Sequence, residues 1–351
     1  VPLRREPGLT SCAAEPRQVV VITSLGAGAW RVGNGLIELD VSAAGLLALR
    51  DRDGRDQLSS SLQLERYRDR GEFWDAWDLA ADYRSQPLGV LCTDSLEWLD
   101  QGPLVAHLVL RRQLGASCMR LDLRLKADTP WLELICGIDW RQTHELLRLE
   151  LPLATPAVRI AADTSGGVIE RPAAPMTARE QARWEVPVIS WFASQSAAPG
   201  GGMAVLLDGP QGVDWSSDRL GISLLRGPTW PDPSADQGWH RQRLALMPFA
   251  GSWSDAGVSQ AAIAFREPGW CADLPAEQRQ WFPSLPLPLT PVGLVRNADG
   301  CVLKLLNSGS ARCRWTPGAG WRVRREADSI AASAVVITPG ELVSLVVDQS
   351  S

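Results

Sequence analysis

Apolar and polar residues alternate along much of this chain. The alternation is strict over residues 37–41, 121–126 and 147–151, where every second residue is Leu, Ile or Val. Successive side chains of a β-strand point to opposite faces of a sheet, so this period of two predicts strands with one buried face and one solvated face. Residues 104–110 and 203–207 are mostly apolar, which predicts strands that are covered on both faces.

Helical periodicity is nearly absent between these segments. Thr177 and Glu180 have the spacing of a capping box, but the apolar pattern after them stops at Pro187, so we expect one short helical turn there. Asp53 and Gly54 are typical of a hairpin tip. Regularly spaced strands with few helices predict an all-β fold in which antiparallel sheets pack face to face as a β-sandwich.

Prolines divide the chain into a large and a small part. Five prolines interrupt regular structure between Cys271 and Pro291, so we predict a Pro-rich linker over residues 271–291. It would join a large antiparallel β-sandwich, residues 30–270, to a small C-terminal β domain, residues 292–351. Residues 1–29 show little pattern and are predicted to be a lead-in segment.

Composition narrows the class of protein. Charged residues make up 21% and hydrophobic residues 45% of the 351 residues, as in folded, water-soluble proteins. The net charge of −5 and the scattered basic residues argue against a nucleic-acid partner. No apolar run approaches the roughly 20 residues that span a bilayer, and the first residues lack the apolar stretch of a signal peptide. Seven cysteines without CxxC spacing favour reduced thiols in the cytoplasm.

Motifs for metal or nucleotide chemistry are missing from the sequence. The three histidines, His107, His144 and His240, form no HxH, HxD or HExxH grouping. The chain contains neither a P-loop nor a GxSxG elbow. Glycoside hydrolysis needs only two placed carboxylates, but sequence alone does not select two from the 40 acidic residues.

Two segments combine charged and aromatic residues. Residues 224–240 carry an Arg, two Asp, two Trp and a His in a stretch that three prolines and two glycines keep from being helical. Residues 72–78 interleave acidic residues with Trp74 and Trp77. Either segment could face a ligand, because carboxylates and Arg bind sugar hydroxyls and Trp covers an apolar sugar face. The alternative is structural: a loop whose Asp and Arg satisfy each other, and a sheet edge with solvated acids and packed Trp.

Several motifs, in this order, resemble the C-terminal half of family 38 α-mannosidases of the bacterial and cytosolic type. They are WRVGNGLI at 30–37, DAWD at 75–78, IDWR with HELL at 138–147, GVIERP at 167–172, WEVP at 184–187, LLR with DQGWH at 224–240, and ALMP at 245–248. The resemblance covers about residues 30–253. Phe249 departs from it, because the family commonly has His after this Pro.

The resemblance implies a large mutarotase-like β-sandwich followed by a small β-sandwich domain. It also implies retaining exo-hydrolysis of α-mannosides at a zinc site. In the family, the zinc ligands and both catalytic Asp residues lie upstream, in an N-terminal barrel and the helical segment after it. We therefore carry over no catalytic residue, metal ligand or cofactor to this chain, and expect zinc only in such a barrel.

The same resemblance implies that the loop after residue 225 reaches toward the sugar pocket of the barrel. On that basis Arg226, Asp232, Asp236 and His240 are the candidate substrate-binding residues. We expect their polar groups to face solvent or to pair among themselves, so that Arg226→Ala would cost little stability.

Three functions remain open. The chain could be the β domains of an α-mannosidase that act on a mannose-containing saccharide with a separate or missing catalytic barrel. It could be a free-standing, non-catalytic carbohydrate-binding sandwich, or a structural or oligomerisation module. In each case we expect little or no hydrolysis by this chain alone. The sequence does not indicate an oligomeric state.

Overall fold

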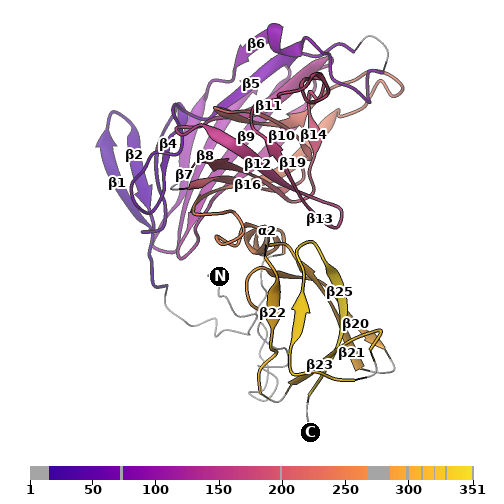
Figure 1. The fold of residues 1–351 in the computed structure, drawn as a ribbon. Coiled ribbons are helices and arrows are strands. Elements are labelled where there is room, and N and C mark those ends of the chain that lie inside the picture. The colour runs from indigo at the N-terminus through magenta and orange to yellow at the C-terminus, as the bar shows by residue number, and fades with distance from the viewer. Residues whose placement is uncertain are drawn as a thin grey trace.

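The computed structural model describes residues 16–71, 74–197, 200–267, 285–297, 300–309, 311–319, 321–328 and 330–349. Strands dominate these residues, and all of the strand pairs in its sheets are antiparallel. A large β-sandwich is followed by a smaller β domain (Figure 1). The predicted all-β fold, with a large antiparallel β-sandwich first and a small β domain after it, is confirmed.

The larger sheet of the sandwich has nine strands in the order β13-β12-β15-β16-β19-β10-β9-β8-β7. Their bounds are Ser95–Gln101 (β7), Val105–Leu114 (β8), Ser117–Lys126 (β9), Leu132–Trp140 (β10), Ala157–Thr164 (β12), Gly167–Pro172 (β13), Trp191–Ser196 (β15), Gly201–Asp208 (β16) and Gly238–Ala250 (β19). The alternating segment at 121–126 lies in β9, as predicted.

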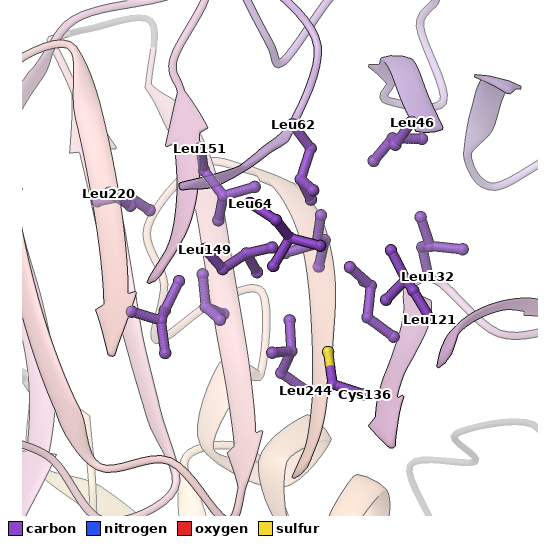
Figure 2. Close-up of a cluster of buried hydrophobic side chains, with 14 of the residues drawn as sticks. Leu46, Leu62, Leu64, Leu121, Leu132, Cys136, Leu149, Leu151, Leu220 and Leu244 are labelled. Carbon is purple, nitrogen blue, oxygen red and sulfur yellow. The ribbon is translucent and has the colours of Figure 1, made fainter. Parts of the chain in front are cut away.

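The facing sheet has six strands in the order β14-β17-β18-β11-β5-β6. Their bounds are Gln63–Arg68 (β5), Pro87–Val90 (β6), Glu145–Pro152 (β11), Val186–Pro187 (β14), Gly212–Ser216 (β17) and Arg219–Leu225 (β18). Leucines from both sheets fill the space between them, including Leu149 and Leu220 from the six-stranded sheet and Leu244 from the nine-stranded sheet (Figure 2).

A four-stranded sheet packs against the nine-stranded sheet at the end formed by β7, β8 and β9. It consists of β1 (Val21–Gly26), β2 (Ala29–Gly33), β3 (Glu38–Ser42) and β4 (Gly45–Arg50). Leu46 and Leu49 of β4 are fully buried in the same core as Leu123 and Leu132. The lead-in predicted for residues 1–29 therefore contains β1 and the start of β2, which pair as a hairpin. The sequence shows no clear alternation in β1, because most of its residues are exposed.

Helices are few, and one was not predicted. α2 (Val258–Arg266) packs Val258, Ala262 and Phe265 on the outer face of the nine-stranded sheet. Alanines at 204 and 245 leave room for it there. The short helix α1 (Ala178–Gln181) has the expected capping box between Thr177 and Glu180, and a 3-10 turn, η1, spans Tyr83–Ser85.

The C-terminal domain has its own core between two small sheets. One sheet has the order β20-β21-β25-β23, and the other pairs β22 with β24. Their bounds are Leu289–Asn297 (β20), Gly300–Asn307 (β21), Cys313–Trp315 (β22), Trp321–Arg325 (β23), Val335–Ile337 (β24) and Leu342–Gln349 (β25). β20 begins inside the predicted linker 271–291, while residues 271–284 lie outside the described part of the chain.

The helix α2 lies between the sandwich and the C-terminal domain (Figure 1). Gln260 of α2 donates a hydrogen bond of 3.3 Å from Nε2 to Oγ1 of Thr290 in β20. Among the described residues, no helix is both long and apolar enough to cross a membrane.

Candidate functional site

Three chain segments meet at one end of the six-stranded sheet. β11 lies between β5 and β18 and is antiparallel to both. The residue after β5, Asp69, and the residue after β18, Arg226, therefore emerge at the same end, where His144 precedes β11. This register brings residues 69–71 and 74–80 beside the loop 226–240, so the two segments of the sequence that combine charged and aromatic residues lie together; Glu72 and Phe73 lie outside the described residues.

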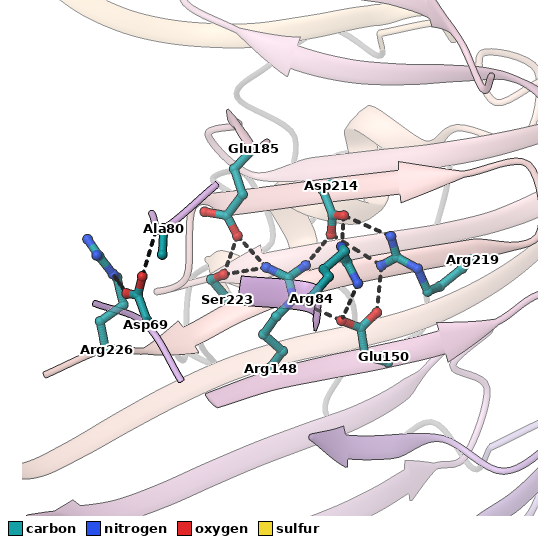
Figure 3. A network of polar contacts seen from close by, with 10 residues as sticks. All are labelled: Asp69, Ala80, Arg84, Arg148, Glu150, Glu185, Asp214, Arg219, Ser223 and Arg226. Atoms are coloured by element: carbon teal, nitrogen blue, oxygen red, sulfur yellow. Dashed lines mark hydrogen bonds and ion pairs between the residues drawn. The ribbon is translucent and has the colours of Figure 1, made fainter. Parts of the chain in front are cut away.

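Arg226 joins these two segments. Its Nε donates to Oδ2 of Asp69, and its Nη2 donates to the backbone carbonyl of Asp78 at 2.7 Å. The other oxygen of Asp69 accepts from the amide of Ala80 at 2.8 Å (Figure 3). The side chain of Asp69 is 2% exposed and that of Arg226 is 17% exposed. The expectation that Arg226 faces solvent or pairs within its own loop is wrong, because its partner is a buried carboxylate on another segment.

Asp75 and His144 form a second brace. Oδ2 of Asp75 accepts from the amides of Thr229 and Trp230 at 2.7 and 3.2 Å. Nε2 of His144 lies 3.1 Å from the Thr229 hydroxyl oxygen, and the His144 amide donates to the carbonyl of Gly227 at 2.8 Å. Nδ1 of His144 lies 3.6 Å from Oδ1 of Asp75. These contacts fix the first turn of the loop against the segment 69–80.

The other three candidate residues differ in position. Oδ2 of Asp236 accepts from the Arg226 amide at 3.2 Å, and the Asp236 carbonyl lies 2.8 Å from Nε2 of His240. Asp232 is exposed and bonds only locally among the described residues, to the amide and hydroxyl of Ser234, which lower its pKa. The fold thus places Arg226, Asp236 and His240 together as supports of the loop, with Asp232 apart on a turn.

Three tryptophans form an exposed cluster on these braced segments. The ring centroids of Trp74 and Trp77 are 6.1 Å apart, and those of Trp77 and Trp230 are 5.5 Å apart. Trp74, Trp77 and Trp230 are 61%, 65% and 52% exposed. We call these three residues the Trp platform. Large grouped apolar faces at a surface mark interaction sites, and indole faces suit the apolar face of a sugar ring.

The site combines exposed indole faces with hydrogen-bonding groups. Among the described residues, no three His, Cys, Asp or Glu side chains gather as they would around a metal ion. The residues described here thus offer no ligand set for the zinc that the resemblance implies, and no step through a metal is derived for them.

Comparison with known proteins gives the family. The family described as "Glycosyl hydrolases family 38 C-terminal domain" matches residues 32–234, which is more than half of the chain. The chain belongs to this family. Residues 32–234 include the segment 69–80 and most of the loop 226–240, so the Trp platform lies within the family domain.

Relatives of known sequence are mannosidases. The chain is 29% identical to alpha-mannosidase 2C1 of Homo sapiens over 278 residues, which cover 76% of this chain and 26% of that protein. It is 26% identical to alpha-mannosidase G of Dictyostelium discoideum over 58% of this chain and 19% of that protein. The chain thus spans about a quarter of the length of the curated relatives it matches.

Solved structures agree with this fold. An alpha-mannosidase from Enterococcus faecalis V583 superposes with a TM-score of 0.70 at 14% identity, over 96% of this chain and 43% of that protein. A second family 38 protein from Enterococcus faecalis gives a TM-score of 0.72 at 13% identity, with 96% and 44% coverage.

Proposed function

We propose that this chain forms the β domains of an α-mannosidase-like glycoside hydrolase and that its Trp platform binds a mannose-containing saccharide. In this proposal the loop 226–240 completes the mannoside pocket of a catalytic barrel. That barrel supplies the zinc and the catalytic carboxylates. The observation that carries the proposal is the exposed Trp platform, which is held on loops that buried polar contacts brace.

Bracing supports binding because a rigid site loses less conformational freedom when a ligand arrives. Arg226 and Asp75 fix both sides of the platform through buried contacts. In this proposal Arg226 acts mainly as a positioning residue, because its guanidinium already donates to Asp69 and to the carbonyl of Asp78. The indole faces make the contact with the sugar.

We also infer that the protein works in the cytoplasm. Five described cysteines, including the exposed Cys92 and Cys118, are unpaired. Free exposed thiols persist in a reducing compartment.

Calorimetric titration of the chain with methyl α-mannoside tests the proposal. We expect saturable binding that Trp77→Ala and Trp230→Ala each weaken about ten-fold, which corresponds to about 1.4 kcal/mol. Leu294→Ala is the control, because Leu294 is also an exposed apolar side chain, at 41%, but lies in β20 of the C-terminal domain, away from the platform. Binding that is absent, or that is equal in all three variants, would contradict a sugar site on the platform.

A second measurement distinguishes saccharide binding from the alternative that the chain is an oligomerisation module. Sedimentation equilibrium of the parent chain and of Trp230→Ala shows whether the platform joins copies of the chain. Self-association that Trp230→Ala abolishes, without any saccharide binding, would favour an oligomerisation module and overturn the proposed function.

A further inference from the structure

A cavity lies on the outer face of the six-stranded sheet, and none of its lining residues belongs to the Trp platform. Its volume is about 290 Å³. Val213 and Asp214 of β17 and Arg219 of β18 line it together with the residues that precede β14. Tyr83 and Arg84 of η1 also contribute to its wall. Binding sites for small molecules measure about 300–1,000 Å³, so this cavity suits a small ligand.

The carboxylates that line the cavity already have partners. Asp214 accepts from Arg148, Arg84 and Arg219, the last at 2.8 Å from Nη2 (Figure 3). Glu185 accepts from Arg148 and from the Ser223 hydroxyl. Glu180 accepts from the amides of Met176 and Thr177, at 2.9 Å each. Arginines therefore offset the charges of Asp214 and Glu185, while backbone amides hold Glu180 in place.

Two arginines of the wall lack such partners. Arg171 and Arg183 both line the cavity. Within the described part of the chain, neither guanidinium forms a hydrogen bond or a salt bridge, although the Glu180 carboxylate, whose pKa is lowered by hydrogen bonds from Met176 and Thr177 and by the charge of Arg183, also lines the cavity. Burial and the nearby charge of Arg183 lower the pKa of Arg171. Arg171 is half-buried and Arg183 is exposed. Two guanidinium groups without a salt bridge at one cavity form a donor set that suits a carboxylate or phosphate.

The Tyr83 hydroxyl is a second, independent sign of a ligand. Tyr83 is 2% exposed, and its hydroxyl has no hydrogen-bond partner among the described residues. Tyr83 lines the cavity, and burial raises the pKa of its hydroxyl to about 12. A buried polar group without a partner is unfavourable, and a ligand hydroxyl would satisfy it.

Aromatic walls complete the site. Trp184 and Trp215 both line the cavity, and Nε1 of Trp215 donates to the carbonyl of Pro172 at 3.2 Å. That hydrogen bond fixes one indole, while Trp184 remains 40% exposed. Fixed indoles beside hydrogen-bonding groups recognise rings that have both apolar faces and hydroxyls.

We propose that this cavity binds a monosaccharide-sized anion, whose phosphate or carboxylate contacts Arg171 and Arg183 while its ring lies against Trp184 and Trp215. The Tyr83 hydroxyl bonds a hydroxyl of the ring. The site does not depend on the Trp platform, so either proposal can fail without the other.

Calorimetric titration with glucose 6-phosphate, glucuronate, glucose and inorganic phosphate tests this site. We expect one of the two anionic sugars to bind at least ten-fold more tightly than glucose and than inorganic phosphate. The better anionic sugar identifies whether phosphate or carboxylate is preferred. Failure of both anionic sugars to bind, or equally tight binding of inorganic phosphate, would overturn the proposal.

Variants locate the site. Arg171→Gln and Arg183→Gln should each weaken binding of the preferred sugar about ten-fold, and Trp184→Ala should weaken it as well. Arg179→Gln is the matched control, because Arg179 is an exposed arginine of α1 that does not line the cavity. Neither Arg171 nor Arg183 is in an ion pair with the described residues, so thermal unfolding midpoints should stay unchanged. Equal affinities of Arg171→Gln and Arg179→Gln for the preferred sugar would contradict the site. Trp230→Ala, a change in the Trp platform, should leave binding of this sugar unchanged.

Discussion

Arg226 and Asp69 show how one contact holds a surface site in place. The carboxylate is 2% exposed and also accepts from the Ala80 amide. Removing the arginine would leave a buried carboxylate without its cation, and this is more costly than losing an exposed ion pair. The same change would release the segment that carries Trp74 and Trp77.

We therefore expect Arg226→Ala to lower the free energy of unfolding by about 3 kcal/mol or more. Arg241→Ala is the control, because Arg241 is exposed and in no ion pair with the described residues, and it should change stability by about 0.5 kcal/mol or less. Urea unfolding curves of the two variants give both values. Similar, small losses in both would show that the Arg226–Asp69 pair is not a stabilising contact.

Asp214 makes stability depend on pH. Burial alone would raise the pKa of this carboxyl, but Arg148, Arg219 and Arg84 lower it from 3.8 to about 2. A carboxyl with a lowered pKa in the folded state stabilises the fold above its unfolded pKa and loses this effect as the pH falls through the folded value. We expect Asp214 to account for about 2 kcal/mol of lost unfolding free energy between pH 4 and pH 2.

Urea unfolding across this pH range tests that expectation. Asp214→Asn should be less stable at pH 7 and should lose less stability between pH 4 and pH 2 than the parent. Glu97→Gln, a change at an exposed side chain, should follow the parent curve. An unchanged pH slope in Asp214→Asn would exclude Asp214 as the titrating group.

The sequence singled out two segments of the candidate site but not the contacts between them. The loop 226–240 and the segment 72–78 stood out by composition, because both mix Trp with acidic residues. Asp69 did not, because it lies in the charged run Arg68-Asp69-Arg70, which is typical of a solvated turn. Its burial follows from the register of β5, β11 and β18, and no local pattern encodes that register.

At the scale of single elements, β16 shows how closely neighbouring strands approach. Val205 and Leu207 face the core between the sheets, while Ala204 and Leu206 face α2. At Gly202, a Cβ atom would lie 1.8 Å from the carbonyl oxygen of Ser194 in β15. That oxygen belongs to the backbone, so the strands would have to separate to admit a side chain.

We expect Gly202→Ala to destabilise the protein by about 1–3 kcal/mol or more, as overpacked sites do. Gly167→Ala serves as the control at the start of β13, where a Cβ atom would meet nothing within 4 Å. Its effect should stay within about 0.5 kcal/mol. Thermal unfolding of both variants, followed by near-ultraviolet circular dichroism, measures the difference, and equal midpoints would show that the strands separate easily.

Strands were easier to predict than the surfaces they form. The alternation at 147–151 correctly marked β11, but its polar face is not solvated: Arg148 is 0% exposed and Glu150 is 4% exposed. Arg84 of η1 and Glu185 before β14 contact this face, and such contacts between distant segments leave no periodic signal. α2 was missed because its buried face is rich in alanine and its N-cap, Gly257, supplies no side-chain cap.

At the scale of the whole molecule, the proposed function assigns saccharide binding to this chain and catalysis to a separate barrel. The resemblance assigns the catalytic groups to a barrel, and the described residues contain no metal-binding cluster. We expect the purified chain to release no product from an aryl α-mannoside, with or without added zinc. Zinc-dependent release that a chelator abolishes would show that this chain carries a catalytic site of its own.

The central strands of the nine-stranded sheet are covered on both sides, by the six-stranded sheet and by α2. β19, with 13 residues, pairs with β10 along one edge and with β16 along the other. Its amides can therefore exchange with deuterium only when the sandwich opens globally, whereas β13 and β7 at the sheet edges exchange after local fraying. Hydrogen-exchange mass spectrometry should find the slowest amide exchange in peptides from β10, β19 and β16. Under native conditions, proteases should cleave these three strands after all other parts of the sandwich.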